Sequence, residues 1–450
     1  MTSKAAQPKE LVLRGVRPLR GELRVPGDKS ISHRALLFAS VAEGTSTLRG
    51  LADGEDVCST RRAIEQLGVE VTDGDDGAVI VHGRGWDGLR EPASVIDCGN
   101  SGTTIRMLAG ILAGRPFRTV LTGDDSIRRR PMARIVGPLT AMGAHIDGRE
   151  QGSLAPLTIT GGALRGTRHV IPVASAQVKS ALLLAGLQAS GTTSVLEPSK
   201  SRDHTERLLA SIGAPITPGL ADAAGAADGG GFEVTVRAGD LSAFDLEVPG
   251  DPSSAAFFVV GALVVPGSDV ALVQVCLNPT RVAFLDVLRR MGAAIDVTQT
   301  GEAGGEPVGD LRVRYGPLRS TVIEGDEIPL VIDEIPVLAV AAAFADGETR
   351  IQDASELRAK ESDRIATVQQ ELSAAGIDVT PHPDGLTIRG GSPKAGAFNS
   401  HGDHRIAMAM AVLANACPGE SRVGDWSATA SSYPGFAGDL LRLAGNVVEE

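Results

Sequence analysis

The sequence predicts an α/β protein of two lobes, because two kinds of helix each recur six times and a motif near the N-terminus returns halfway along the chain. With 450 residues the chain is too long for one ordinary core, so two domains of about 200 residues each are expected. Hydrophobic residues make up 42% and charged residues 22%, as in a soluble globular protein. Aromatics are only 3%, whereas Gly and Ala are plentiful, which favours tight helix packing.

The first helix series consists of small apolar residues, and each helix ends near a glycine and precedes an alternating strand. We expect these helices at Ile31–Val41, Thr103–Ala113, Val178–Gln188, Ser254–Val264, Ile335–Phe344 and Ile406–Ala414. The closing glycines are Gly44, Gly114, Gly191, Gly267, Gly347 and Gly419.

A second helix series ends in glycines that would act as left-handed C-caps before a strand. These glycines are Gly68, Gly143, Gly213, Gly292, Gly376 and Gly445. Within either series the glycines stand 69 to 84 residues apart, which indicates six units, each with two helices and several strands.

Six such units could form a solenoid or two compact lobes of three. The Val-Pro-Gly-Asp of residues 25–28 returns at 248–251, so we place one lobe at residues 21–246 and the other at 1–20 plus 247–450. The stretches Pro218–Gly231 and Gly301–Gly309 are rich in glycine and are expected to be flexible loops.

Charge and composition exclude several classes of function. A net charge of −12 and few aromatics argue against a nucleic-acid partner. No apolar run is long enough to span a membrane, and the polar N-terminus lacks a signal-peptide core, so a cytoplasmic protein is expected. The four cysteines include no C-x-x-C pair and are expected to be reduced.

Unusual polar residues gather at the N-termini of the first helix series. Residues 26–34, Pro-Gly-Asp-Lys-Ser-Ile-Ser-His-Arg, read as an anion cradle that opens a helix, with Ser30 or Ser32 as the cap. Asp251–Ser254 is interpreted as an ordinary cap. Four cations lie about one turn further into these helices: Arg34, Arg106, Lys179 and Arg405. Helix capping does not require them, so they predict a multiply anionic ligand in a cleft between the lobes.

Three more charged clusters stand out. Residues 128–131 read Arg-Arg-Arg-Pro, 202–204 read Arg-Asp-His, and 360–364 read Lys-Glu-Ser-Asp-Arg. Arg128 and Arg129 are expected to be solvated. A phosphate and a carboxylate would explain the others, because arginine can grip both with two hydrogen bonds.

With these motifs together, the chain resembles the 5-enolpyruvylshikimate-3-phosphate (EPSP) synthase family over essentially its whole length. The matching motifs, beyond the cradle at 26–34, are Gly-Asn-Ser-Gly-Thr, Arg-Arg-Pro-Met, Ala-Ser-Ala-Gln-Val-Lys-Ser, Arg-Asp-His-Thr-Glu, Ile-Asp-Glu-Ile-Pro, Lys-Glu-Ser-Asp-Arg and Asp-His-Arg-Ile-Ala-Met. Together they are specific, although each alone would be weak.

The resemblance implies a two-lobed enolpyruvyl transferase fold with six βαβαββ repeats, three per lobe, around buried parallel helices. It implies a transferase of the shikimate pathway of aromatic amino-acid biosynthesis that moves the enolpyruvyl group of phosphoenolpyruvate to the 5-hydroxyl of shikimate 3-phosphate. No metal or organic cofactor takes part, the partners are these two small substrates, and a monomer is expected. The family is the target of glyphosate, which occupies the phosphoenolpyruvate site.

The resemblance also implies roles for residues. Asp333 would be the base for the 5-hydroxyl and Glu361 the acid that protonates the methylene carbon, with Lys29 as the competitor for the acid role. Shikimate 3-phosphate would contact Lys29, Ser30, Arg34, Ser175, Ala176, Gln177, Arg202, Asp333 and Lys360. Phosphoenolpyruvate would contact Lys29, Gly102, Arg130, Gln177, Arg364 and Arg405.

One departure is Ser431, which stands where many members have a lysine, and Glu356 stands where others have an asparagine. Two alternatives remain. The related transferase that acts on UDP-N-acetylglucosamine generally uses a cysteine acid, and residues 124–130 contain none. A non-catalytic phosphate-ligand binding protein would explain the cations but not Asp333 and Glu361.

Overall fold

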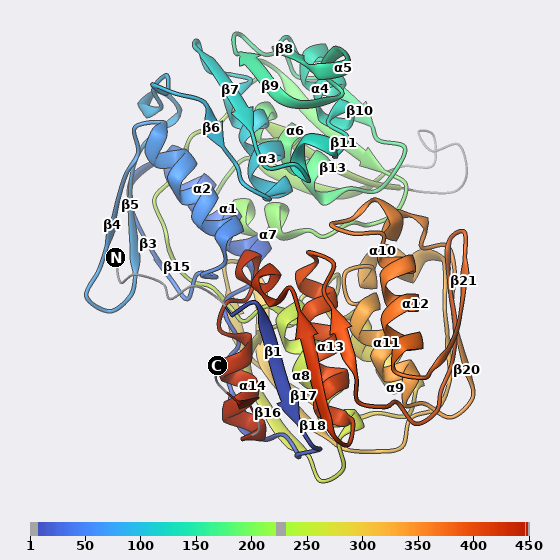
Figure 1. Ribbon diagram of the computed structural model, residues 1–450. Helices are drawn as coiled ribbons and strands as arrows, with labels where there is room; N and C mark the ends of the chain where they lie inside the picture. The colour runs from blue at the N-terminus through green and yellow to red at the C-terminus, as the bar shows by residue number, and fades with distance from the viewer. Residues whose placement is uncertain (1–7, 222–230, 446, 449–450) are drawn as a thin grey trace. The chain divides into compact units, whose positions relative to one another are not determined.

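The computed structural model describes residues 8–221, 231–445 and 447–448 (Figure 1). The chain divides into two compact units. The N-unit comprises Gly27–Val248 and Glu302–Glu306, and the C-unit comprises Met1–Pro26, Pro249–Gly301 and Pro307–Glu450. Each unit is described separately below.

The N-unit contains three sheets that repeat one pattern. Their strand orders are β14-β3-β5-β4 (with β15 also on β3), β6-β7-β9-β8 and β10-β11-β13-β12. The strands are β3 (Ala42–Arg49), β4 (Glu70–Asp73), β5 (Val79–Arg84), β6 (Ile96–Asp97), β7 (Arg118–Thr122), β8 (His145–Gly148), β9 (Leu154–Thr160), β10 (Arg168–Val170), β11 (Thr192–Glu197), β12 (Ile216–Ala221), β13 (Gly231–Arg237), β14 (Leu241–Ser242) and β15 (Asp245–Glu247).

The C-unit repeats the pattern three more times. Its sheets have the orders β17-β18-β16-β2, β19-β20-β22-β21 and β23-β24-β1-β25. The strands are β1 (Glu10–Arg14), β2 (Arg20–Leu23), β16 (Asp269–Cys276), β17 (Ala294–Ala303), β18 (Glu306–Arg314), β19 (Val322–Ile323), β20 (Glu348–Ile351), β21 (Asp378–His382), β22 (Gly385–Arg389), β23 (Ala397–Asn399), β24 (Glu420–Gly424) and β25 (Val447–Val448).

Each sheet combines parallel pairing on one strand with antiparallel pairs, and in the first sheet both β14 and β15 run parallel to β3. In the second repeat β6 runs parallel to β7, and β9 then pairs antiparallel with both β7 and β8. With the helices that follow β6 and β7, this is the βαβαββ unit, so the fold prediction is confirmed. Three repeats complete their sheets with distant strands: β14 and β15 pair with β3, β2 pairs with β16, and β1 pairs with β24.

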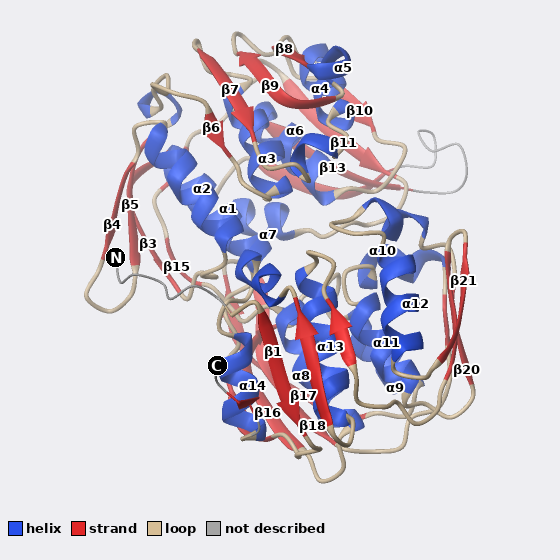
Figure 2. Cartoon of the chain, viewed as in Figure 1, coloured by secondary structure: helices blue, strands red, loops and turns tan. Residues whose placement is uncertain are grey.

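The first helix series forms the inner layer of each unit. These helices are α1 (Lys29–Val41), α3 (Gly102–Leu112) and α6 (Ala176–Gly186) in the N-unit, and α8 (Pro252–Val264), α11 (Ile335–Ala343) and α13 (His404–Ala416) in the C-unit. Every residue of α8, α11 and α13 is buried, and these three helices pack against one another. In Figure 2 the strands of the C-unit lie around these helices.

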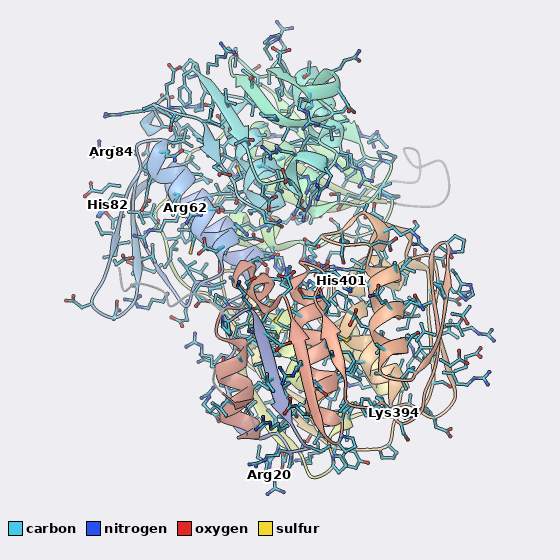
Figure 3. All side chains as sticks on the ribbon, viewed as in Figure 1. Arg20, Arg62, His82, Arg84, Lys394 and His401 are labelled. Carbon is cyan, nitrogen blue, oxygen red and sulfur yellow. The ribbon has the colours of Figure 1, made fainter. Side chains whose placement is uncertain are left out.

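Small residues permit the close packing. In α3 a Cβ on Gly110 would stand 2.1 Å from the carbonyl oxygen of Ala181 in α6, so only glycine fits there. Charged side chains occupy the outer surfaces instead, as Figure 3 shows for Arg62 and Arg84 of the N-unit and for Arg20 and Lys394 of the C-unit.

The second helix series consists of α2 (Glu55–Gln66), α4 (Ala133–Ala141), α7 (His204–Ser211), α9 (Ala283–Arg290), α12 (Arg364–Ala374) and α14 (Phe436–Ala444). The predicted left-handed glycines follow them, for example Gly292 with a φ of 98°. Two short helices, α5 (Arg149–Gly152) and α10 (Ile328–Val331), and five 3₁₀ turns complete the elements in the described part of the chain.

Two predicted loops are wrong in part. Residues 301–309 belong largely to the hairpin of β17 and β18, because alternating residues over Glu306–Arg314 bury one face despite the glycines at its tip. Residues 218–221 of the predicted loop 218–231 lie in β12, Gly231 begins β13, and 222–230 lie outside the described residues. The cysteines are free, as predicted.

Candidate functional site

The start of α1 presents Lys29 and Ser30 on its first turn. Asp28 caps the helix, because its Oδ1 accepts a hydrogen bond from the backbone N–H of Ile31 at 2.8 Å. The prediction of Ser30 or Ser32 as the cap is therefore wrong. Ser32 Oγ instead donates to the Asp28 carbonyl at 2.8 Å. An aspartate cap is favourable because its negative charge also lies at the positive end of the helix dipole.

Lys29 is held by a carboxylate that the sequence did not single out. Its Nζ lies 3.0 Å from Asp56 Oδ2 on α2, and both side chains are mostly buried. The ion pair directs the ammonium group toward the first turn of α2, so Lys29 is a positioned cation rather than a solvated one.

Arg34 ties three helices of the N-unit together. Its Nε donates to Thr205 Oγ1 of α7 at 2.7 Å and its Nη2 to Ser180 Oγ of α6 at 2.9 Å, while Nη1 donates to the carbonyl of Ser30 at 2.9 Å. Burial lowers the pKa of Arg34 to about 10, although Glu206 nearby raises it. A buried guanidinium with neutral hydrogen-bond partners is well suited to receive an anion.

The start of α6 brings together Ser175, Ala176 and Gln177. Ser175 caps the helix, and its backbone N–H donates to Glu197 Oε1 at 3.2 Å. Glu197 also accepts a hydrogen bond from Ser201 Oγ at 2.6 Å, next to the predicted Arg202. One buried carboxylate therefore connects the segment that precedes α6 with the turn that precedes α7.

Lys179 has its anions inside the protein. Its Nζ lies 2.7 Å from Glu197 Oε2 and 2.6 Å from Glu206 Oε1, and only 1% of its side chain is exposed. Burial alone would lower the pKa of Lys179, but the two carboxylates outweigh it and the pKa is raised. The expectation that Lys179 requires a bound anion is therefore wrong.

The start of α3 places two guanidinium groups around Gly102. A Cβ built on Gly102 would lie 2.8 Å from Arg106 Nη1 and 3.1 Å from Arg130 Nη1. Arg106 Nη1 donates to Gln177 Oε1, and Gln177 Nε2 donates to Thr103 Oγ1 at 3.0 Å. The predicted contacts Gly102, Arg130 and Gln177 are therefore neighbours. Arg128 and Arg129 are exposed, as predicted.

In the C-unit, three predicted cations surround Asp333. Its Oδ1 lies 3.5 Å from Lys360 Nζ and 3.5 Å from Arg364 Nη1, and its Oδ2 lies 3.8 Å from Arg405 Nη2. Arg405 also donates through Nη1 to the Asp333 carbonyl at 2.9 Å. The side chain of Asp333 remains 17% exposed, so part of it is open to solvent.

Arg364 also forms an ion pair with Glu361, which lies next to this cluster. Its Nη2 lies 2.7 Å from Glu361 Oε2, and its Nε lies 2.8 Å from Asp403 Oδ2. Burial alone would lower the pKa of Arg364, but Asp403 and Glu361 raise it above its ordinary value. Likewise, burial would raise the pKa of Asp403, and Arg364 brings it below the usual range.

Three residues that shape the sites were absent from the predicted site residues: Asp56, Glu197 and Asp403. Arg106 was predicted as a cation for the anionic ligand but was assigned to neither substrate. Asp403 was visible as the acid before α13, where it caps the backbone N–H of Arg405 at 2.9 Å. Asp56 and Glu197 were not predicted, because their cationic partners, Lys29 and Lys179, lie 27 and 18 residues away. Ser431 Oγ donates to the Ala428 carbonyl at 2.9 Å, within a 3₁₀ turn at Trp426–Ser431.

The side chains can hold anions and move protons. Among the described residues no group of three His, Cys, Asp or Glu side chains could hold a metal ion, and no helix is long and apolar enough to cross a membrane.

Comparison with known proteins gives a consistent family. A family model described as EPSP synthase (3-phosphoshikimate 1-carboxyvinyltransferase) matches residues 13–440. A 3-phosphoshikimate 1-carboxyvinyltransferase of Desulforudis audaxviator is 52% identical over 431 residues, which cover 95% of this chain and 97% of the relative. One from Synechococcus sp. (strain CC9605) is 49% identical over 446 residues, 98% of this chain and 99% of the relative.

Solved structures agree. EPSP synthase from Acinetobacter baumannii superposes with a TM-score of 0.85 at 40% identity and covers 98% of this chain and 99% of its own. The enolpyruvyl transferase NikO from Streptomyces tendae has a TM-score of 0.76 over 98% of each chain at 18% identity, which shows the shared fold.

Proposed function

Because the chain belongs to the EPSP synthase (3-phosphoshikimate 1-carboxyvinyltransferase) family, we propose that Asp333 and Glu361 carry its proton transfers. The enzyme transfers the enolpyruvyl group of phosphoenolpyruvate to the 5-hydroxyl of shikimate 3-phosphate and releases phosphate. The observation that supports the assignment most strongly is the cluster of Asp333, Glu361 and three cations in the C-unit.

The reaction needs three proton transfers: one onto the methylene carbon, one from the 5-hydroxyl and one from the new methyl group. A proton is added to the methylene carbon of phosphoenolpyruvate, which leaves the adjacent carbon cationic. The 5-hydroxyl oxygen bonds to that carbon, and its proton passes to the base. The tetrahedral adduct then loses a proton from the new methyl group and expels phosphate, which restores the carbon–carbon double bond. These reaction steps require a carboxylate base, a carboxylic acid and cations that bind the phosphate.

Asp333 fits the base because three neighbouring cations stabilise its negative charge while part of the side chain stays accessible. Its position is also fixed through the backbone, since Arg405 holds its carbonyl at 2.9 Å. A base must keep its geometry while the hydroxyl is polarised, and the two contacts from one arginine serve that purpose.

Glu361 fits the acid once a substrate engages Arg364. The ion pair at 2.7 Å favours the carboxylate form of Glu361. An anionic substrate that forms an ion pair with the Arg364 guanidinium would weaken the pair between Arg364 and Glu361. It would thereby favour a protonated Glu361. Lys29 of the N-unit is the competing candidate for the same role.

The remaining residues divide between the substrates. We assign shikimate 3-phosphate to Lys29, Ser30, Arg34, Ser175, Ala176, Gln177, Arg202, Asp333 and Lys360. We assign phosphoenolpyruvate to Lys29, Gly102, Arg130, Gln177, Arg364 and Arg405. The contacts of Arg34 with α6 and α7, and of Gln177 with α3, support grouping the N-unit residues in this way.

Phosphate release from phosphoenolpyruvate, measured with and without shikimate 3-phosphate, tests the assignment. The native enzyme should release phosphate only with both substrates. Asp333→Asn should lower turnover by about two to four orders of magnitude. The isosteric control Asp326→Asn, at an exposed carboxylate of the same unit, should stay within twofold of the native enzyme. A loss of less than about tenfold in Asp333→Asn would remove Asp333 as the base.

We further propose that the chain works as a cytoplasmic monomer of two lobes. The boundaries predicted at 21–246 and at 1–20 plus 247–450 are replaced by those of the N-unit and C-unit, because β2 pairs with β16. Light scattering coupled to size exclusion, with and without both substrates, measures the oligomeric state directly. A mass of twice 46.4 kDa would contradict the monomer.

A further inference from the structure

A buried carboxylate of the N-unit binds next to two proposed contacts of shikimate 3-phosphate. Glu197, the last residue of β11, is fully buried, and both of its oxygens are engaged. Its Oε1 accepts hydrogen bonds from the backbone N–H of Ser175 at 3.2 Å and from Ser201 Oγ at 2.6 Å, and its Oε2 lies 2.7 Å from Lys179 Nζ. Ser175 is itself a proposed contact, and Ser201 immediately precedes another, Arg202.

The two segments that Glu197 joins lie outside regular backbone structure. Ser175 is the N-cap of α6, and Ser201 lies in the stretch 198–203 between β11 and α7, which forms neither strand nor helix. Lys200 and Asp203 pair within this stretch at 3.0 Å, but the Lys200 side chain is 44% exposed, so that pair contributes little. Hydrogen bonds to a buried carboxylate are a stronger constraint on such segments.

Lys179 keeps the carboxylate of Glu197 in place. Its Nζ, on a side chain only 1% exposed, lies beside Glu197 and also 2.6 Å from Glu206 Oε1 of α7. The ammonium group is therefore held from β11 and from α7 at once. Because separating a buried ion pair is costly, Glu197 has one strongly favoured position.

The geometry calls for a carboxylate despite its charge. A carboxylate near a bound phosphate repels it, so charge alone would favour glutamine at position 197. The single carbonyl oxygen of a glutamine could not serve the N–H of Ser175, the hydroxyl of Ser201 and the ammonium of Lys179 together, and its NH₂ group would face one of these donors.

We propose that Glu197 is a positioning residue for shikimate 3-phosphate. It holds the backbone of Ser175 and the turn that carries Arg202 in the geometry that receives the substrate. This inference rests on the proposed assignment of Ser175 and Arg202 to shikimate 3-phosphate, and it concerns the N-unit alone.

Glu197→Gln separates positioning from charge, because the two effects have opposite signs. The Kd of shikimate 3-phosphate is measured by calorimetry, and the KM of phosphoenolpyruvate is measured at saturating shikimate 3-phosphate. The variant should bind shikimate 3-phosphate about tenfold more weakly or worse, since hydrogen bonds to a charged group are lost, while the KM should change by less than about threefold. Unchanged or tighter binding, or equal losses for both substrates, would overturn the proposal.

Ser201→Ala removes one hydrogen bond to Glu197 without a change of charge, so it keeps the test decisive even where Glu197→Gln fails to fold. The affinity for shikimate 3-phosphate should fall by about threefold to tenfold. The control is Ser40→Ala, at another buried serine of the N-unit, whose Oγ donates to the Leu37 carbonyl at 2.7 Å. The control should keep the native affinity. No loss in Ser201→Ala, or an equal loss in the control, would refute the proposal.

Arg202→Gln tests the premise separately from the inference. Native affinity in this variant would refute the assignment of Arg202 to the substrate, and the inference with it. If the variant does bind more weakly, adding Ser201→Ala should cost less than it does in the native enzyme, because the contact that Ser201 positions is already lost. Fully additive losses would show that Ser201 does not act through Arg202 and would overturn the proposal.

Discussion

Arg364 Nε lies 2.8 Å from Asp403 Oδ2, and the two side chains are 1% and 0% exposed. The same carboxylate caps α13 through the backbone N–H of Arg405, while the same guanidinium contacts Glu361 and Asp333. This buried pair therefore stabilises the C-unit and also positions the two proposed proton-transfer groups, Asp333 and Glu361.

We expect Asp403→Asn to destabilise the enzyme by about 3–5 kcal/mol, because removal of one partner leaves the other charge buried. Asp363→Asn is the matched control, since Asp363 also caps a helix and pairs with an arginine, but its side chain is 39% exposed. The control should cost less than about 1 kcal/mol. Urea unfolding of both variants measures the difference, and equal costs would show that burial does not matter here.

Glu361→Gln should lower turnover by about two to four orders of magnitude, because the amide cannot donate the proton that the methylene carbon needs. Its shape and its contact with Arg364 Nη2 can remain. The control Glu356→Gln, at an exposed glutamate in the same 3₁₀ turn region, should retain activity. Steady-state kinetics with both substrates measure the effect. If turnover falls less than about tenfold, Lys29 becomes the better candidate for the acid.

Gly102→Ala should weaken glyphosate inhibition more than it weakens the use of phosphoenolpyruvate. The new methyl group would push against Arg106 and Arg130, the latter a proposed phosphoenolpyruvate contact, at a cost of about 1–3 kcal/mol. Glyphosate is longer than phosphoenolpyruvate, so the displaced guanidinium groups should weaken its binding more. The inhibition constant and the Michaelis constant for phosphoenolpyruvate are compared in both forms.

Gly137→Ala serves as the control for Gly102→Ala, because a Cβ there meets nothing within 4 Å. It should change neither constant. Equal shifts of both constants in Gly102→Ala would refute the steric account, and an insensitive native enzyme would refute its premise.

The stability of the N-unit should fall between pH 6.5 and pH 5 because of His33. This side chain is fully buried, and burial together with Lys29 and Arg34 holds its pKa well below the ordinary value of 6.5, although Asp28 opposes the shift. In this window the unfolded chain binds a proton that the folded chain does not. Acidification therefore favours unfolding, by up to about 1.4 kcal/mol per pH unit.

His33→Gln should remove that part of the pH dependence, measured as the shift of the urea midpoint between pH 7 and pH 5. His145→Gln changes a histidine on β8 whose side chain is 75% exposed, and it should keep the native dependence. The same pH dependence in His33→Gln as in the native enzyme would show that other groups cause it.

Local patterns predicted the repeated part of the fold. The glycine-closed apolar helices agree with α1, α3, α6, α8, α11 and α13, because each helix is specified by its own small residues and C-terminal glycine. The partners of edge strands were not predictable in this way. Nothing in residues 241–247 indicates pairing with β3, which precedes them by almost the whole N-unit.

The charged residues show the same limit. Lys29, Arg34, Asp333 and Arg364 were proposed as site residues because they stand in motifs. The prediction for Lys179 was wrong because its anionic partners, Glu197 and Glu206, lie in other elements. A cation beside a helix N-terminus has the same sequence pattern whether its anion is a ligand or a distant side chain. Only the three-dimensional structure distinguishes the two.

The early strands of the chain have late partners, and this sets the order of folding during synthesis. Leu11 of β1 pairs with Val423 of β24, so the first strand leaves the ribosome some four hundred residues before its partner. The segment Gly27–Val248, which contains nearly all of the N-unit, is complete much earlier. The nascent chain must therefore carry β1 and β2 as unpaired segments while the N-unit folds, and such edges are where association with other chains begins.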